Sequence, residues 1–437
     1  FARYFLFSMK RFFHSLFEFS FQGLILILPF MTIISVFTNE KLWLHGFSFL
    51  KELLVLSMGI GLLSAVYKKR ISLHWNRYNF LIGLYIITLI GITVFTTGFM
   101  GMIYGGRYDF SFLIAFLLMV HGYPLLKHPL SYYLRLFLIS SGIALFAGMS
   151  LKWPFSEDFL LYLGFSGNPS NWQFGWAVPI FHGVDGANVR RLQGIFDGPN
   201  TMGAYILIYM GILAYYFRNK KNWYFVIGCV LCVGVLGLYY TYSRSALLGL
   251  VGGVGITVLS LLPILWKKYK LQMSVFFSVI LIGIMTVLFL FSDSIRAIFD
   301  RQWSTKWHAE RMFVGYHRFI DHPFWQWLGS AGPAYRYVAN LETTKREEIE
   351  KLDTYYIPES WYIQQMVEWG IFGTIFFLLI MICIFWSLLS ISSVIGGMFT
   401  SILIMNFFLH TFESSLVSLS LFLLAGLFIG ADISRKY

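Results

Sequence analysis

Four arginines in this chain stand where long apolar segments begin or end: Arg107, Arg191, Arg244 and Arg311. A guanidinium group beside lipid is costly and is usually kept for a partner, and its fork of N–H donors suits phosphate or carboxylate groups. For any single arginine, the alternative is a side chain that snorkels to the membrane interface or forms an ion pair. All four are expected on the outer side of a membrane, where basic residues are disfavoured, so together they indicate an anion-binding site.

Two of these arginines belong to one predicted hairpin. Apolar segments on either side of the basic turn 218–221 cross a bilayer and return, so Arg191 and Arg244 finish on the same face. Ser243 and Ser245 flank Arg244 directly, and Asn200 lies at the start of the first apolar segment of the hairpin. We therefore place Asn200 and Ser243 with the arginines as candidate substrate-binding residues.

Glu359 is the candidate general base. It stands in Pro358-Glu359-Ser360-Trp361, where a long hydrophilic stretch meets the next apolar segment. Burial beside aromatic side chains would raise the pKa of this carboxyl and make it a better base near neutral pH. The alternative is a carboxylate that the dipole of a helix N-terminus favours. His308 and His322 are further candidates for a base or a phosphate contact, and the alternative for each is a structural or solvated histidine.

Familiar cofactor and metal motifs are missing from the sequence. It contains no Walker A sequence, no dinucleotide-binding fingerprint and no His-Glu-x-x-His, so the anion must be recognised by side chains. Glycines 252, 253 and 255 lie within an apolar segment, where small residues let helices approach closely. The three cysteines, Cys229, Cys232 and Cys383, lie in apolar runs and form no metal-ligand pattern. We expect neither a metal nor a cofactor.

The composition is that of a membrane protein. Of its 437 residues, 57% are hydrophobic and only 12% are charged, and the mean hydropathy is +0.68, whereas about a quarter of a globular domain is charged. The net charge of +12 reflects basic residues that cluster at the ends of apolar segments. This pattern follows the positive-inside rule and suits contact with anionic lipids, and it does not indicate a nucleic-acid partner.

The chain is predicted to be all-α, a single transmembrane domain over 1–437 with about twelve spans and both termini in the cytoplasm. Residues 1–20 form an interfacial arm before the first span. Two long outer loops, 150–199 and 292–361, are too long to be simple connections. In the second, 307–320 is predicted to be a helix with Arg311 and Arg318 on one face and His308 one turn before Arg311. The predicted spans are 21–37, 50–67, 80–99, 110–126, 136–149, 201–217, 223–240, 246–266, 273–291, 362–388, 394–410 and 416–431.

Four short motifs, in this order, resemble those of the O-antigen ligase and O-antigen polymerase superfamily of bacterial envelopes, the WaaL and Wzy type. They are Arg191-x-x-Gly194 with Pro199-Asn200-x-x-Gly203, Ser243-Arg244-x-Ala246-x-x-Gly249, Arg311 upstream of Asp321-His322-Pro323, and Glu359-Ser-Trp-Tyr362 leading to Glu368-x-Gly370-x-x-Gly373. The predicted layout of spans, with its large outer loop between the ninth and tenth, extends the resemblance over nearly the whole chain.

The resemblance implies a glycosyltransferase of the bacterial inner membrane, with its active site on the periplasmic or extracellular face. The donor would be an oligosaccharide on a polyprenyl (undecaprenyl) pyrophosphate, and the acceptor a hydroxyl on a glycan, lipid or protein. Such enzymes are metal-independent members of the GT-C class and usually invert the anomeric centre. By position, Arg191, Arg244 and Arg311 match arginines thought to hold the donor phosphates and sugar.

One departure from the family pattern bears on the acceptor. Ligases typically carry His-Asn where this chain has Glu359-Ser360, whereas acidic residues are familiar there in polymerase-like members. The alternative function is a flippase or transporter for lipid-linked glycans, because about twelve spans is a common transporter size. Against a transporter, the spans show no two-half repeat and the basic residues stand at the mouth of the bundle instead of mid-membrane.

Overall fold

The computed structural model describes residues 2–69, 71, 76–96, 106, 108–152, 159–167, 178–180, 183–184, 187–221, 223–262, 302–321 and 359–436. Arg107, His322, the predicted span 273–291 and most of the loop 292–361 lie outside these residues.

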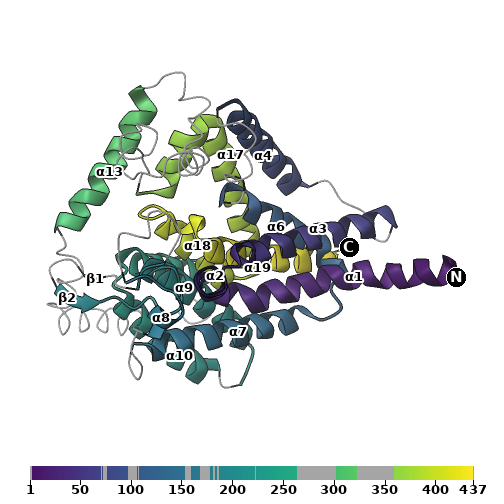
Figure 1. The fold of residues 1–437 in the computed structure, drawn as a ribbon, viewed down its shortest axis with the longest axis horizontal. Coiled ribbons are helices and arrows are strands. Elements are labelled where there is room, and N and C mark those ends of the chain that lie inside the picture. The colour runs from purple at the N-terminus through teal and green to yellow at the C-terminus, as the bar shows by residue number, and fades with distance from the viewer. Residues whose placement is uncertain are drawn as a thin grey trace.

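The described chain is helical, as predicted, apart from one small antiparallel pair of strands (Figure 1). Seven of its helices are long and apolar enough to cross a membrane, and shorter apolar helices accompany them. The full count of twelve spans and the cytoplasmic side of both termini stay predictions. The strands are β1 (Gly183–Val184) and β2 (Ala187–Arg190). The helices are α1 (Ala2–Ile27), η1 (Leu28–Phe30), α2 (Met31–Lys41), η2 (His45–Phe49), α3 (Leu50–Tyr67), α4 (Arg77–Thr96), α6 (Ser111–Gly122), η3 (Tyr123–Leu125), α7 (Leu130–Ser150), α8 (Phe159–Tyr162), α9 (Pro199–Phe217), α10 (Trp223–Thr241), an unlabelled helix (Arg244–Leu262), α13 (Gln302–Asp321), α17 (Trp361–Ile391), α18 (Ser393–Met405), η5 (Thr411–Glu413) and α19 (Ser415–Lys436).

Helix α19 is the centre of the bundle. Nearly every residue from Leu416 to Ala431 is buried, and the helix packs most extensively against α6. Gly426 and Gly430 permit this close approach, because a Cβ atom at Gly426 would lie 2.7 Å from the carbonyl oxygen of Phe116 and one at Gly430 would lie 2.8 Å from the Cβ atom of Tyr123. This is the small-residue spacing that lets membrane helices meet backbone to backbone.

Glycines also join the helix Arg244–Leu262 to α18. A Cβ atom at Gly253 would lie 2.5 Å from the carbonyl oxygen of Gly397, and one at Gly397 would lie within 2.4 Å of the carbonyl oxygen of Gly253. The helix packing predicted for this glycine-rich stretch is confirmed at Gly253.

The amino-terminal region differs from the prediction. Residues 2–20 are continuous with the first span, because α1 runs through them to Ile27, and Phe17 and Glu18 are already buried within the bundle. The predicted first span is also not one straight helix. The chain changes direction at η1, where Pro29 removes a backbone donor, and Figure 1 shows α2 end-on while α1 lies across the view.

Helix α17 is broken within the predicted tenth span. Gly370 has φ 63° and ψ −166°, a conformation that essentially only glycine adopts, so the helix divides into 361–369 and 371–391. The first part is short and buries Trp361, Gln364 and Gln365, and the second is a long apolar segment. Hydropathy predicted one continuous span here because both parts are apolar.

Candidate functional site

Glu359 lies between two side chains from a distant helix. The Nδ1 atom of His308 is 3.1 Å from Glu359 Oε2, and the Nη1 atom of Arg311 is 3.5 Å from Glu359 Oε1. His308 and Arg311 belong to α13, whose extent confirms the helix predicted over 307–320, and the two residues are three apart and face α17 together. We call His308, Arg311 and Glu359 the Glu359 cluster.

The electrostatics of Glu359 overturn one expectation. Its side chain is 18% exposed, and this burial alone would raise the pKa of the carboxyl. The hydrogen bond and charge of His308, together with the charges of His410 and Arg311, outweigh burial and lower the pKa of Glu359 below its ordinary value. Glu359 is therefore ionised at neutral pH.

Arg191 forms hydrogen bonds that connect three segments of the chain. Its Nε atom donates to the carbonyl oxygen of Thr241 at 2.8 Å, and its Nη2 atom donates to Asn200 Oδ1 at 2.8 Å. Arg191 follows β2 directly, Asn200 is in the first turn of α9, and Thr241 ends α10. Arg191 therefore contacts this end of the predicted hairpin directly, and Arg191, Asn200 and Thr241 form the Arg191 cluster.

Ser243 and Arg244 stand at the start of the next helix. The Ser243 hydroxyl accepts a hydrogen bond from the backbone N–H of Ala246 at 3.4 Å and lies 3.1 Å from the hydroxyl of Ser245. This is the position of a helix N-cap, so Ser243 has a structural role besides any contact with substrate. Arg244 is the first residue of that helix and is half-buried, where the helix dipole also favours an anion.

The chain segment between α18 and α19 connects the two clusters. The backbone N–H of Trp361, two residues after Glu359, donates to the carbonyl oxygen of Asn406 at 2.9 Å. Gln364 Nε2 donates to Glu413 Oε1 at 2.9 Å, and the hydroxyl of Ser414 donates to Asp197 Oδ2 at 3.3 Å. Asp197 is three residues before Asn200, so a continuous run of contacts links the Glu359 cluster to the Arg191 cluster.

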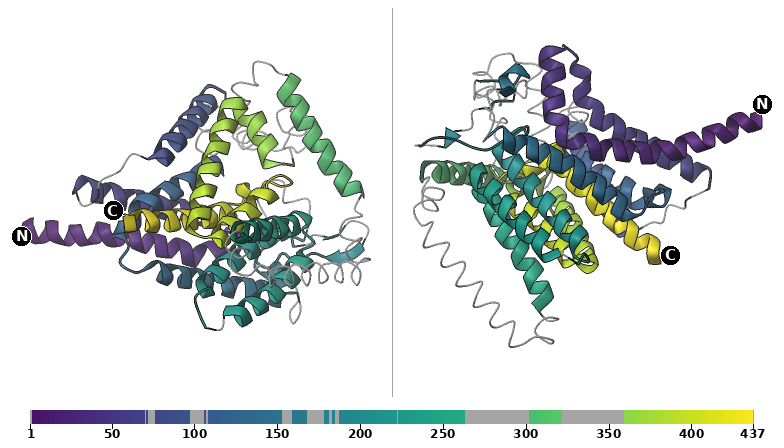
Figure 2. Two further views of the ribbon diagram at one scale, coloured as in Figure 1. Left: turned by 180° about the vertical axis from the view of Figure 1, so that it is seen from behind. Right: turned by 90° about the horizontal axis from the view of Figure 1, so that it is seen from below.

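Both clusters belong to the same part of the molecule. The β1–β2 hairpin, which leads into Arg191, and α13, which carries His308 and Arg311, lie at the end away from both chain termini (Figures 1 and 2). Among the predicted site residues, Arg311 meets Glu359 and Arg191 meets Asn200, while Ser243 and Arg244 follow Thr241 within two and three residues. Arg107 and His322 lie outside the described residues, so their roles stay predictions.

Little or nothing in the sequence indicated that His308 and Thr241 belong to the site. His308 was one of several loop histidines, and only the helical spacing to Arg311 hinted that both would reach one partner. The contribution of Thr241 is a backbone carbonyl, which no residue type could have indicated.

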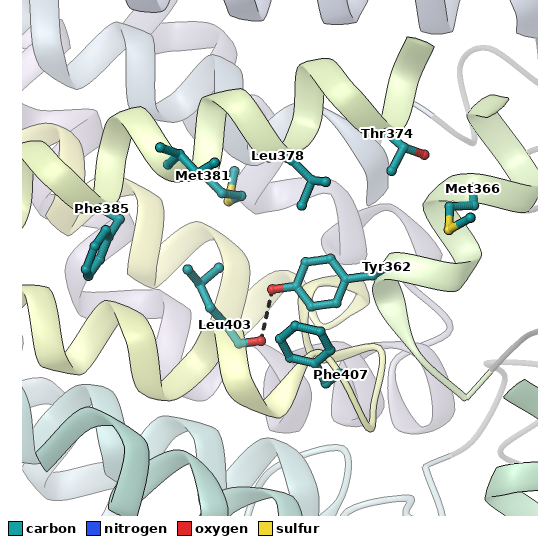
Figure 3. Close-up of a pocket in the computed structure, with 9 residues that line it drawn as sticks. Tyr362, Met366, Thr374, Leu378, Met381, Phe385, Leu403 and Phe407 are labelled. Atoms are coloured by element: carbon teal, nitrogen blue, oxygen red, sulfur yellow. Dashed lines mark hydrogen bonds between the residues drawn. The ribbon is translucent and has the colours of Figure 1, made fainter. Parts of the chain in front are cut away.

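An apolar groove of about 360 Å³ begins one helical turn from Glu359 (Figure 3). It lies between the two parts of α17 and the end of α18, with Leu378 and Met381 on one side and Tyr362, Leu403 and Phe407 on the other. The hydroxyl of Tyr362 donates to the carbonyl oxygen of Leu403 at 3.0 Å, which fixes this ring at the groove. The break at Gly370 creates the space, because it turns the short part of α17 away from the long part.

No cluster of three or more His, Cys, Asp or Glu side chains that could hold a metal occurs in the described part of the chain. The candidate groups for an anion are therefore guanidinium, imidazole and hydroxyl groups.

The fold and these clusters define a multi-pass helical membrane protein with cationic side chains and one carboxylate gathered at one end of its bundle. Residues 227–378 match the family model described as O-antigen ligase, which supports the resemblance of the motifs to the O-antigen ligase and polymerase superfamily. The matched stretch contains Ser243, Arg244, Arg311 and Glu359. A comparison with curated proteins finds no match.

Proposed function

We propose that this protein transfers or polymerises a glycan from a polyprenyl (undecaprenyl) pyrophosphate carrier onto a hydroxyl acceptor, on the outer face of the bacterial inner membrane. The match of residues 227–378 to the O-antigen ligase family model supports glycosyl transfer in general. The observation that carries the fuller proposal is the Glu359 cluster, in which one ionised carboxylate faces an arginine and a histidine from α13.

The reaction needs one base and a positive environment for the leaving group. An acceptor hydroxyl that attacks the anomeric carbon must lose its proton, and Glu359 is placed to receive it. The departing pyrophosphate is already a weak base and needs no acid, but it gains negative charge, which guanidinium groups stabilise. Arg311 beside Glu359, together with Arg191 and Arg244, supplies such groups, and Arg107 and His322 complete the proposed set.

The apolar groove suits the carrier. A prenyl chain is a branched hydrocarbon, and the groove offers it an almost entirely apolar lining that starts beside Tyr362. A pyrophosphate at the Glu359 cluster would then have its hydrocarbon chain directed along the long part of α17. Because the acceptor is a glycan, lipid or protein hydroxyl in different members of such a superfamily, its class is left open by this arrangement.

The test is a transfer assay with purified protein in nanodiscs, using a polyprenyl-pyrophosphate oligosaccharide and a glycan acceptor. We expect a covalent product with the wild type and a loss of at least about 10²-fold in turnover with Glu359→Gln, because general base catalysis contributes roughly that much or more. The matched control is Glu310→Gln, which removes a carboxylate of α13 that is 56% exposed and pairs with Lys306. Turnover by Glu359→Gln equal to that of the wild type would remove Glu359 from the mechanism.

The same purified protein, reconstituted into closed lipid vesicles, tests the alternative function. A flippase or transporter of lipid-linked glycans would move the donor across the bilayer without a covalent product. Transport of intact donor, with no product for any acceptor class, would replace the glycosyltransferase proposal.

A further inference from the structure

We propose that His308 receives the proton that Glu359 removes from the acceptor hydroxyl, so that the two side chains work as a proton relay. This inference rests on the proposed function and adds a second residue to the proton transfer. It stands on the geometry of the two carboxylate oxygens, which face partners of different chemistry.

The two carboxylate oxygens of Glu359 differ in whether the neighbouring side chain can accept a proton from them. Oε1 lies 3.5 Å from the guanidinium of Arg311, which is always protonated and has no acceptor atom. Oε2 lies 3.1 Å from Nδ1 of His308, and a neutral imidazole accepts a proton at an unprotonated ring nitrogen. A proton that reaches the carboxylate can therefore pass on to His308 but not to Arg311.

The charges around Glu359 favour transfer of this proton to another group. The positive charges of His410, from the segment before η5, and of Arg311, from α13, favour the ionised form of Glu359 even when His308 is neutral. A base that holds its proton weakly regenerates quickly when a neighbour takes the proton. His308 is also the more exposed member of the pair, with 35% of its side chain exposed against 18% for Glu359, although its Nδ1 atom is buried against the carboxylate.

The proposed reaction exchanges one bond at the acceptor oxygen and one at the anomeric carbon. The O–H bond of the acceptor breaks and its oxygen forms the new bond to the anomeric carbon, while the bond from that carbon to the pyrophosphate oxygen breaks and its electron pair leaves with the pyrophosphate. The proton moves to Glu359 Oε2 and then to His308 Nδ1, and the imidazolium that forms gives up one proton to water to restore a neutral His308. The relay needs a neutral His308 at the start of each turnover.

A purely structural His308, which only holds α13 against α17, predicts different behaviour from a relay. His308→Asn separates the two, because an asparagine amide keeps a polar group near the Nδ1 position but cannot accept a proton at neutral pH. We expect this variant to lose on the order of 10²-fold in kcat, the lower end for general acid–base catalysis, with little change in KM for the donor.

The pH dependence gives a second readout. In the wild type, kcat should show an inflection and fall as the pH is lowered, because the relay requires an imidazole that can accept a proton. We expect this inflection to be absent in His308→Asn. In His308→Ala, added imidazole should restore part of the lost kcat, which also shows that the variant is folded. The control His317→Asn changes an exposed histidine of the same helix, which packs on Phe313, and should behave as the wild type.

These outcomes separate the two proposals. An active wild type with unchanged kcat and pH profile in His308→Asn overturns the relay and leaves the proposed function standing. A wild type that forms no covalent product from the polyprenyl-pyrophosphate donor overturns the proposed function, and the relay with it.

Discussion

Glu359 shows how opposing effects on one carboxyl decide its chemistry. Burial favours the neutral acid, but a histidine and an arginine from α13, together with His410, favour the anion, and the anion prevails. The pKa is lowered, so the carboxylate contributes to stability above its unfolded-state pKa, and this contribution is lost as the pH falls through the lower folded-state pKa. Glu359 is therefore ionised at neutral pH and can act as a base there.

Substitutions of Arg191 test the proposed anion-binding site. We expect Arg191→Ala to reduce turnover by about 10²- to 10³-fold, the range for removing one group that stabilises a developing anion. Arg191→Lys should recover only part of the activity, because lysine lacks the planar fork that reaches both Thr241 and Asn200. The measurement is kcat and KM in the transfer assay.

The neighbouring Arg190 provides the control for that test. Arg190 carries the same charge but is exposed at the end of β2. Arg190→Ala should retain nearly full turnover, and an equal loss in both variants would indicate a general charge effect in place of a specific site.

Residue types predicted part of this site. A carboxylate at the edge of an apolar segment and an arginine on a loop helix were visible in the sequence, and both lie in the Glu359 cluster. The direction of the pKa shift was wrong, because it depends on which charges surround the carboxyl, and two of them come from a helix distant in the sequence. Contacts to backbone carbonyls, such as Arg191 with Thr241, leave no trace in residue types.

Two glycines control the elements around the site in different ways. Gly370 breaks α17 through its backbone conformation, and Gly253 lets two helices touch through its missing side chain. Hydrophobic periodicity predicted the positions of most described helices but not the break, because an apolar run looks continuous whether or not one residue inside it leaves the helical conformation.

Gly370→Ala tests the break. An alanine at φ 63° and ψ −166° is strained, and we expect a loss of about 1–3 kcal/mol in stability together with reduced transfer activity. Thermal unfolding in detergent measures the first effect. Gly83→Ala, in α4, is the control, because its added Cβ would meet no atom within 4 Å. An unchanged melting temperature in Gly370→Ala would show that α17 can run straight.

Gly253→Ala tests helix packing. The added methyl would lie 2.5 Å from the carbonyl oxygen of Gly397, so the helices must separate, at a cost of about 1–3 kcal/mol. Gly255→Ala, two residues further on, meets open space and should leave stability unchanged or slightly higher. Equal melting temperatures for the two variants would contradict this account of the contact between the helix Arg244–Leu262 and α18.

On the scale of the whole molecule, the candidate site and the chain termini lie at opposite ends (Figure 2). The positive-inside rule predicted this separation, since it placed the termini in the cytoplasm and the arginines outside. The sequence could predict the positions of most described helices along the chain because they are apolar segments. It could not predict that α19 is the centre of the bundle, since a buried span and a lipid-facing span are similarly apolar.

Cysteine labelling tests the orientation of the whole chain. In a variant lacking Cys229, Cys232 and Cys383, we expect a membrane-impermeant maleimide to label Lys306→Cys, on α13, from outside intact spheroplasts. Lys220→Cys, in the exposed turn after α9, should react only after the membrane is opened. The reverse pattern would invert the topology and place the candidate site in the cytoplasm.

The contact between Arg311 and Glu359 implies that binding of the donor substrate can increase the basicity of Glu359. An arriving pyrophosphate carries more negative charge than one carboxylate and would draw the Arg311 guanidinium toward itself. Glu359 would then keep its burial but lose part of its positive surroundings, so its proton affinity would increase only when the donor is in place. We expect the pKa of Glu359, followed by carbon NMR of a selectively labelled sample, to rise when a non-reactive pyrophosphate lipid binds. A pKa that stays constant on binding would mean that the guanidinium never leaves the carboxylate.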